Sequence, residues 1–293
     1  MKKYNILNLE SYNYSKIAKK ELQKVGRYFD EKQVIKKGNI DVIICRFKYK
    51  LDKHFLKKFK NLKYILTNTT GLNHIDIGYC KIKNIKVFSL KNQKKFLKNI
   101  TSTAELYLGL ILSLYRRIPH AISDVKKSKW DRNKFLGSNL SKKNIGIFGL
   151  GRNGLLLAKY CKALDMNVTF FDRNKKSRIY KKIGNLKNFL GNLDILAICI
   201  NYSEENHKLI NKHFLNLMPI HSILVNCARG ELIDEKHLLR HLQKKKIRGV
   251  ALDVVSEENS LNSKKNILIE YSKKNNNLII TPHIGGATKD SWK

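Results

Sequence analysis

The chain has few prolines and no long hydrophobic run. It contains 3 prolines in 293 residues, and no proline-rich linker or repeat is present. The most apolar helix-like stretch, residues 104–115, is far shorter than the about 20 residues that a membrane-spanning helix needs. The amino-terminal residues reach the polar Asn8 and the acidic Glu10 too early to form a signal-peptide core. We therefore predict a cytoplasmic protein that does not enter a membrane.

The cysteines show neither a disulfide framework nor a metal-binding pattern. No CxxC pair and no zinc-type spacing occurs, so we expect reduced thiols in an intracellular protein. His237 and His241 stand one helical turn apart and could chelate a metal, but they lie in a lysine-rich amphipathic segment without a third ligand. We predict no metal, and a metal at this pair is the less favoured alternative. The five cysteines, mostly in or beside apolar runs, are Cys45, Cys80, Cys161, Cys199 and Cys227.

Acidic residues are scarce. The chain has 23 Asp and Glu against 59 Lys and Arg, a formal net charge of +36. Such an excess would ordinarily indicate nucleic acid or an anionic membrane as partner. Lysine pairs recur along the whole length, however, and the accompanying richness in Asn and Ile favours a genome-wide codon bias. We expect no specific nucleic-acid partner, and that alternative rests on charge alone.

Short β-like runs alternate with helix-like segments along the whole chain. A first group precedes residue 91, and a second, larger group follows a buried helix expected at residues 101–115. This alternation predicts an α/β protein with two doubly wound, mostly parallel sheets. The strand-like runs are residues 4–9, 41–45, 63–67, 86–90, 145–149, 168–171, 195–200, 222–225, 249–252 and 278–280.

Three glycines form a dinucleotide-binding fingerprint. Gly149, Gly151 and Gly154 directly follow the apolar run 145–149 and open a helix-like segment. The first glycine permits a tight turn, the second lets the backbone approach a pyrophosphate, and the third allows the helix to pack closely on the strand. The helix amino terminus would stabilise the phosphate charge. This context makes the pattern much more specific than an isolated match.

Asp172 ends the strand-like run that follows the fingerprint. A carboxylate at this position accepts hydrogen bonds from the adenosine ribose and repels a 2′-phosphate, which favours NAD over NADP. The basic residues Arg173, Lys175 and Lys176 weaken this discrimination. NAD is therefore the predicted cofactor, with NADP as the alternative.

Several motifs in order resemble those of the D-isomer-specific 2-hydroxyacid dehydrogenases, the family that includes phosphoglycerate, glycerate and formate dehydrogenases. The fingerprint is one of them, and three more lie at residues 226–231, 251–258 and 281–286. Upstream, residues 70–76 are similar to the substrate-loop motif of the family, and the similarity extends from about Asp41 to the end.

The resemblance implies hydride transfer between the nicotinamide and a small anionic D-2-hydroxy or 2-keto acid, phosphoglycerate-like or glycerate-like. Arg229 would hold the substrate carboxylate and polarise the reacting oxygen, since its guanidinium fork matches a carboxylate. His283 would exchange the hydroxyl proton, because imidazole titrates near neutral pH. Glu258 would hold that ring in the useful tautomer. Each residue alone also has an ordinary explanation as a surface arginine, a loop histidine or a solvated acid.

The resemblance implies further roles. Thr70 and Gly71 would offer backbone N–H groups to the substrate, and Arg46 could meet a phosphate or second carboxylate. The helix expected at residues 101–115 would pack against its mate in a homodimer. Asp253 would meet the nicotinamide amide, and the cofactor would also be lined by Arg152, Asn153, Asn206 and Cys227.

The resemblance also implies two Rossmann-like domains, one that binds the substrate and one that binds NAD. Residues 1–98 would form a flavodoxin-like substrate-binding domain, and residues 99–284 an NAD-binding Rossmann domain. Residues 285–293 would begin a truncated carboxyl-terminal return to the first domain. Because so little chain follows His283, a protein that binds NAD(H) but is catalytically impaired, acting as a sensor or interaction protein, is the alternative function.

Overall fold

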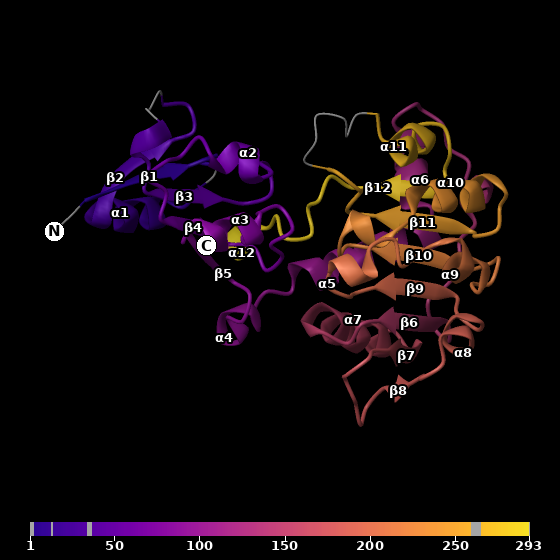
Figure 1. Cartoon of the computed structure of the whole chain (residues 1–293). Coiled ribbons are helices and arrows are strands. Elements are labelled where there is room, and N and C mark those ends of the chain that lie inside the picture. Colours follow the sequence, from indigo (N-terminus) through magenta and orange to yellow (C-terminus); the bar gives the residue numbers. More distant parts are fainter. Residues whose placement is uncertain (1–2, 13, 34–36, 259–264, 293) are drawn as a thin grey trace. The chain divides into compact units, whose positions relative to one another are not determined.

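The computed structural model describes residues 3–12, 14–33, 37–258 and 265–292. The chain divides into two compact units, Met1–Asn99 with Trp292–Lys293, and Ile100–Ser291 (Figure 1). We call them unit 1 and unit 2. Of the expected return segment 285–293, the last residue lies outside the described part. No helix in the described part is long and apolar enough to cross a bilayer.

Unit 1 contains a five-stranded sheet in the order β2-β1-β3-β4-β5. All of its strand pairs are parallel. Apolar side chains on one sheet face, such as Ile43 and Ile65, pack against α2 and α3, while Ile6 and Ile44 face the side where α1 lies. The elements are β1 (Tyr4–Asn8), α1 (Lys16–Val25), β2 (Gly26–Asp30), η1 (Lys37–Asn39), β3 (Val42–Cys45), α2 (Lys53–Leu56), β4 (Tyr64–Thr67), α3 (Ile77–Ile82), β5 (Lys86–Ser89) and α4 (Lys94–Leu97).

Strand β2 was not among the predicted strands. It begins at the residue that follows α1, so no turn signal separates the two elements. A Cβ on Gly26 would lie 2.2 Å from the Tyr4 carbonyl oxygen, which shows how closely the edge strand approaches β1. The remaining residues of β2 are half-buried or exposed, so the strand lacks the apolar run that identifies its neighbours.

Unit 2 contains a seven-stranded sheet in the order β12-β11-β10-β9-β6-β7-β8, again with parallel pairs throughout. The prediction of two doubly wound parallel-sheet domains is therefore confirmed. The two-residue edge strand β8 was not predicted, since it consists of exposed lysines. The strands are β6 (Asn144–Phe148), β7 (Asn167–Phe171), β8 (Lys181–Lys182), β9 (Ile195–Ile198), β10 (Ile223–Asn226), β11 (Gly249–Leu252) and β12 (Leu278–Ile280).

Helices cover both faces of the unit 2 sheet. On one face, buried residues of α5 and α7 pack against Ile147 and Val225, and on the other, residues of α8 to α11 pack against Phe148 and Leu224. This double cover explains why the central strands are continuous apolar runs. The helices are α5 (Ser102–Tyr115), α6 (Ile118–Val125), η2 (Asn133–Phe135), α7 (Arg152–Ala163), α8 (Leu186–Leu190), η3 (Glu204–Asn206), α9 (Lys212–Asn216), η4 (Gly230–Leu232), α10 (Glu235–Gln243), α11 (Ile267–Ser272) and α12 (Lys289–Trp292).

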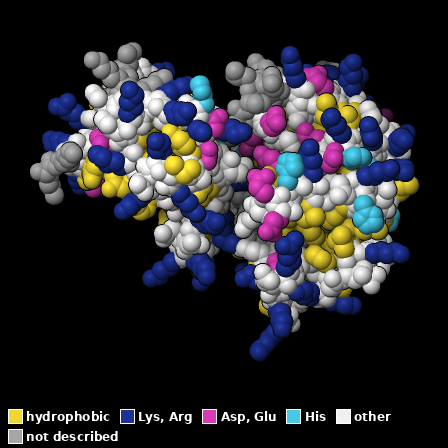
Figure 2. All heavy atoms as spheres, viewed as in Figure 1, with side chains coloured by type: hydrophobic (Ala, Val, Ile, Leu, Met, Phe, Trp, Pro, Cys, Tyr) yellow, Lys and Arg dark blue, Asp and Glu magenta, His cyan; other side chains and the backbone are white. Residues whose placement is uncertain are grey.

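Basic side chains are spread over the surface. Figure 2 shows lysine and arginine on all parts of the visible face of each unit, interspersed with other side chains. This distribution matches the even spacing of lysine along the sequence and does not define one polyanion-binding patch on that face.

Candidate active site in unit 2

The sheet of unit 2 brings the predicted reactive residues to one edge. Strands β10, β11 and β12 are neighbours and run parallel, so the segments after them leave the sheet on the same side. Arg229 follows β10, Asp253 and Glu258 follow β11, and His283 follows β12. The fingerprint follows β6 at the same edge, where open α/β sheets bind ligands.

His283 and Glu258 form a close pair. The Nδ1 of His283 lies 2.5 Å from the Oε1 of Glu258, and each side chain is 21% exposed. The backbone of His283 has φ of +53°, a left-handed conformation that is uncommon outside glycine. Since a carboxylate only accepts, this contact assigns a proton to Nδ1 of the neutral ring.

Arg229 is half-buried, and its charge interacts with that of Glu258. Its Nη1 donates a hydrogen bond to the Ala228 carbonyl at 2.6 Å. Burial lowers the pKa of the guanidinium, and the charges of Glu258 and Glu231 oppose that shift. A half-buried guanidinium, whose planar donors match the two oxygens of a carboxylate, is suited to holding one.

Asp253 anchors the turn that contains His283. Its Oδ1 accepts hydrogen bonds from the Thr281 hydroxyl at 2.6 Å and from the Ile284 N–H at 2.8 Å, and its Oδ2 accepts from the Gly285 N–H at 2.8 Å. Burial raises the pKa of Asp253, while these donors act in the opposite direction. Both carboxylate oxygens are thus engaged by the chain itself.

The glycine fingerprint has the shape that a dinucleotide requires. Gly149 has φ of +102°, and a Cβ on Gly154 would lie 2.1 Å from the Gly149 carbonyl oxygen. A Cβ on Gly151, in contrast, would meet no atom within 4 Å. The first and third glycines are therefore needed by the fold itself, whereas the second leaves open space at the amino terminus of α7. Such a space fits a pyrophosphate.

Asp172 lies at the end of β7 and is held by the backbone. Its Oδ2 accepts from the Leu150 N–H at 2.8 Å, and its Oδ1 accepts from the N–H groups of Asn174 and Lys175, both at 2.9 Å. Burial alone would raise the pKa of Asp172, but the backbone donors outweigh it and the pKa is lowered. A fixed, ionised carboxylate next to the fingerprint turn suits a ribose with a free 2′-hydroxyl.

The other predicted cofactor residues differ in their surroundings. Arg152 donates to the Ile100 carbonyl, and Cys227 is buried. The buried Oδ1 of Asn153 has no hydrogen-bond partner among the described residues, which leaves an acceptor for a donor on a ligand. Asn206 is engaged within its own loop, where it contacts Ser203 and Asn201 at 2.8 Å.

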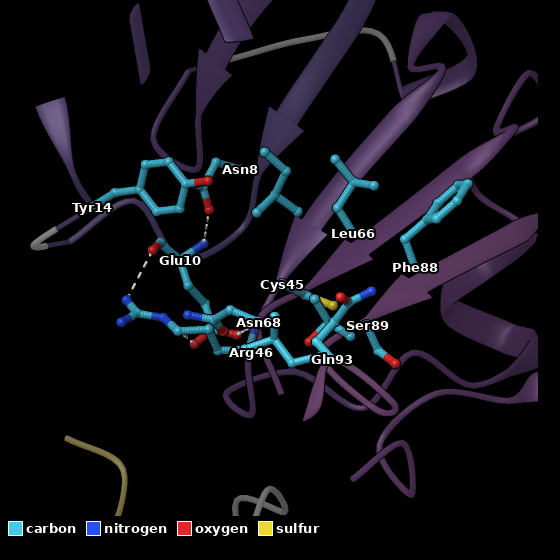
Figure 3. A pocket seen from close by; sticks show the side chains of 13 residues that line it. Asn8, Glu10, Tyr14, Cys45, Arg46, Leu66, Asn68, Phe88, Ser89 and Gln93 are labelled. Atoms are coloured by element: carbon cyan, nitrogen blue, oxygen red, sulfur yellow. Dashed lines mark hydrogen bonds and ion pairs between the residues drawn. The ribbon is translucent and has the colours of Figure 1, made fainter. Parts of the chain in front are cut away.

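Unit 1 holds the remaining predicted residues. In the described part of the chain, no hydrogen bond uses the N–H groups of Thr70 or Gly71. Arg46 lies in a cavity of about 370 Å³ at the carboxyl ends of β1, β3, β4 and β5. Figure 3 shows its side chain beside Glu10, with which it forms an ion pair at 3.7 Å. Its guanidinium also donates to the carbonyls of Glu10 and Tyr12.

Two acidic residues near the reactive edge were not predicted. Glu231 lies within η4, two residues after Arg229, and burial followed by the charge of Glu258 raises its pKa. Glu235 begins α10 and contacts the segment that contains Glu258. The sequence signal for Glu231 was its place in the motif 226–231, whereas nothing near Glu235 in sequence indicated its contacts.

The two histidines of α10 make separate contacts with the surrounding chain. His241 is buried, with Nδ1 2.8 Å from the His237 carbonyl and Nε2 3.0 Å from Asn216 Oδ1. His237 pairs with Asp234 at 2.9 Å. Across the described residues, no cluster of three or more potential metal ligands occurs.

Comparison with known proteins identifies relatives of this arrangement. A sequence profile described as "D-isomer specific 2-hydroxyacid dehydrogenase, NAD binding domain" matches residues 108–285. A Staphylococcus saprophyticus protein with a provisional 2-hydroxyacid dehydrogenase name is 34% identical over 270 residues, which are 89% of this chain and 81% of that protein. A D-3-phosphoglycerate dehydrogenase of Archaeoglobus fulgidus is 34% identical over 255 residues, 86% of this chain and 46% of that enzyme.

A solved structure is similar over nearly the whole chain. The D-lactate dehydrogenase of Aquifex aeolicus, determined with NAD and lactic acid, superposes with a TM-score of 0.84 at 28% identity. The superposition covers 98% of this chain and 90% of that enzyme.

Proposed function

Because the chain belongs to the family of D-isomer-specific 2-hydroxyacid dehydrogenases, we propose that it transfers a hydride between NAD and a small D-2-hydroxy or 2-keto acid. The observation that carries the proposal is the His283–Glu258 contact beside the half-buried Arg229, at the sheet edge that also holds the fingerprint. Unit 2 would bind NAD, and unit 1 would contribute substrate-binding groups.

The residues then have distinct tasks. Bound NAD supplies or accepts the hydride. Arg229 holds the substrate carboxylate and polarises the reacting oxygen, which a guanidinium can do without changing its protonation. His283 gives a proton to that oxygen through Nε2 during reduction and removes it during oxidation. Glu258 keeps the proton of the resting imidazole on Nδ1 and fixes the orientation of the ring.

Cofactor binding would use the open space at Gly151, with the pyrophosphate at the amino terminus of α7 and the adenosine ribose at Asp172. Arg152, Asn153, Asn206, Cys227 and Asp253 remain proposed cofactor contacts. The side chains of Asp253 and Asn206 already form hydrogen bonds within the protein. Each would have to bind NAD through a lone pair or an N–H that these hydrogen bonds do not use.

For the substrate, we favour a small acid with an uncharged side chain, such as glyoxylate, pyruvate or hydroxypyruvate. Arg46 is the residue expected to bind a phosphate, and its ion pair with Glu10 already compensates its charge. Thr70 and Gly71 would offer their N–H groups to the carboxylate. A strong preference for phosphohydroxypyruvate would contradict this order of substrates.

An NADH-oxidation screen with these four keto acids tests the proposal. Arg229→Ala and His283→Ala should each lower kcat/KM by at least about 100-fold, because general acid catalysis and oxyanion stabilisation each contribute on that scale. Unchanged turnover in either variant would overturn the assignment. NADH binding without turnover of any 2-keto acid would instead support the cofactor-binding, catalytically impaired alternative.

We also propose a homodimer, with its interface on α6 and not on the helix at residues 101–115 (α5) that the sequence suggested. Ile118, Ile122 and Val125 are 40%, 51% and 52% exposed and share one helix face, and the exposed Leu136 follows nearby in sequence. Light scattering after size-exclusion chromatography should give twice the chain mass. Ile122→Glu should give a monomer, whereas Ile179→Glu, the same change at an isolated exposed isoleucine, should not. A monomeric wild type would refute the proposal.

A further inference from the structure

Glu235 contacts Ser256, close to Glu258 in sequence, and Asn266, the residue before α11. Its Oε1 accepts a hydrogen bond from the Ser256 N–H at 2.6 Å, and its Oε2 accepts one from the Asn266 side-chain amide at 2.7 Å. Glu258 lies two residues after Ser256. A single carboxylate therefore bonds to Ser256, after β11, and to Asn266, the residue before α11.

The orientation of Asn266 is determined by the helix that it caps. Its Oδ1 accepts from the N–H groups of Leu268 at 2.9 Å and Ile269 at 3.3 Å, at the start of α11. Since the oxygen is used there, the amide nitrogen must face Glu235. Glu235 is itself the first residue of α10, where a helix amino terminus favours a carboxylate. Both partners are thus held by the ends of helices.

A close backbone contact constrains the same segment. A Cβ on Gly230 would lie 2.0 Å from the Val255 carbonyl carbon, so η4 packs directly against the residue before Ser256. Within the described residues, the bond to Glu235 is the one hydrogen bond that joins the backbone of residues 256–258 to another element. The backbone that carries Glu258 is therefore tied to α10 through Glu235.

We propose that Glu235 is a positioning residue for the His283–Glu258 pair. By holding Ser256 and Asn266, it sets the position from which Glu258 accepts the Nδ1 proton of His283. The inference rests on the proposed function, because that function assigns the pair to proton exchange. It adds a residue that touches neither His283 nor Arg229 in any hydrogen bond or ion pair of the described chain.

A double-mutant experiment tests whether Glu235 acts through Glu258. Glu235→Gln keeps an acceptor for Ser256 but places an amide donor against the amide of Asn266. We expect kcat to fall about tenfold, since small misplacements of catalytic groups are costly, with the NADH dissociation constant within about twofold of wild type. In a Glu258→Ala background, Glu235→Gln should lower kcat less than about twofold. An equal loss in both backgrounds would overturn the proposal.

A spectroscopic readout that needs no turnover separates this inference from the proposed function. Long-range proton–nitrogen spectra of the histidine side chains report the tautomer of His283, identified by its loss in His283→Asn. Glu258→Ala and Glu235→Gln should both shift the neutral ring away from the Nδ1–H form that Glu258 stabilises. A wild-type tautomer in Glu235→Gln would overturn the proposal. Absence of turnover with shifted tautomers would refute the proposed function alone.

A second variant guards against simple loss of folding. Asn266→Ser keeps an oxygen to cap α11 but removes the donor to Glu235, so it should shift the tautomer and lower kcat in the same direction. Asn211→Ser is the matched control, since Asn211 caps α9 in the same way and makes no contact with Glu235. If both Asn variants have equal effects, the bond to Glu235 has no special role and the proposal fails.

Discussion

The carboxylate of Asp253 holds the turn that carries His283. The Asp253 carbonyl accepts the His283 N–H at 2.8 Å, and its side chain accepts the next two backbone N–H groups. The left-handed backbone of His283 is therefore supported by hydrogen bonds to the neighbouring strand connection. Proton exchange at His283 would therefore depend on Asp253, whose carboxylate oxygens accept hydrogen bonds from the chain itself.

This relationship predicts a stability cost for Asp253→Asn. Asparagine offers one acceptor oxygen where aspartate offers two, so the N–H of Ile284 or Gly285 loses its partner. We expect a loss of about 1–3 kcal/mol in the free energy of unfolding. Thr281→Val, which removes only one hydroxyl donor, should cost about 1 kcal/mol. Urea unfolding measures both, and equal midpoints for Asp253→Asn and wild type would contradict the anchoring role.

Substitutions of two fingerprint glycines should have different effects, one on thermal stability and the other on NADH affinity. Gly154→Ala places a Cβ 2.1 Å from the Gly149 carbonyl oxygen, so the thermal midpoint should fall by several degrees. Gly151→Ala meets no protein atom within 4 Å, so its midpoint should match wild type. Its NADH affinity should nevertheless fall at least about tenfold, because the methyl group occupies the space proposed for the pyrophosphate. Unchanged NADH affinity in Gly151→Ala would show that the cofactor lies elsewhere.

Asp172 should contribute stability that disappears in acid. Although burial opposes it, backbone donation lowers the folded-state pKa of Asp172 below its unfolded value of about 3.9. A depressed carboxyl pKa contributes stability that is present above the unfolded pKa and is lost as the pH falls through the folded pKa. Wild type should therefore be more stable than Asp172→Asn at pH 6, and the difference should shrink below about pH 4. Thermal unfolding of both proteins across this range is the measurement, and a difference that does not depend on pH would contradict it.

Glu231 should show the opposite dependence. Burial, reinforced by the charge of Glu258, raises the folded-state pKa of Glu231 above its unfolded value. Stability associated with this group is present below the unfolded pKa and is lost as the pH rises through the folded pKa. Glu231→Gln should therefore gain stability relative to wild type between pH 4 and pH 7. Glu270→Gln, at an exposed residue, serves as control. Greater stability of wild type at pH 7 would refute the assignment.

The fully buried strands were all predicted, and so was the edge strand β5, whose residues alternate between exposed and half-buried. Residues 195–198, 223–226 and 249–252 are buried throughout, and such continuous apolar runs can be recognised without knowledge of tertiary contacts. Strands β2 and β8 are sheet edges with mostly half-buried or exposed residues. Their pairing partners, rather than their own composition, make them strands, so periodicity could not reveal them.

In the candidate site, too, some residues could be predicted from the sequence and others could not. Motif order placed His283 and Glu258 in one hypothesis, and the structure brings them into contact, although their catalytic roles stay predictions. The anchors of these residues were not predicted. Asp253 supports the His283 turn, and Glu235 reaches Asn266 across 31 positions of sequence. Such contacts arise where loops of separate strands meet, and no local pattern encodes them.

The reactivity of the buried cysteines should report local unfolding of the structure around each of them. Burial raises the pKa of Cys45 to about 12 and that of Cys80 to about 11 in unit 1. In unit 2, burial raises the pKa of Cys161 to about 12 and that of Cys227 well above its usual value. Alkylation requires an accessible thiolate, so these thiols should react only after the surrounding structure opens. The alkylation rates of Cys45 and Cys80 would therefore measure how fast unit 1 opens locally, and those of Cys161 and Cys227 would do the same for unit 2. Mass spectrometry of the wild-type protein can follow all four.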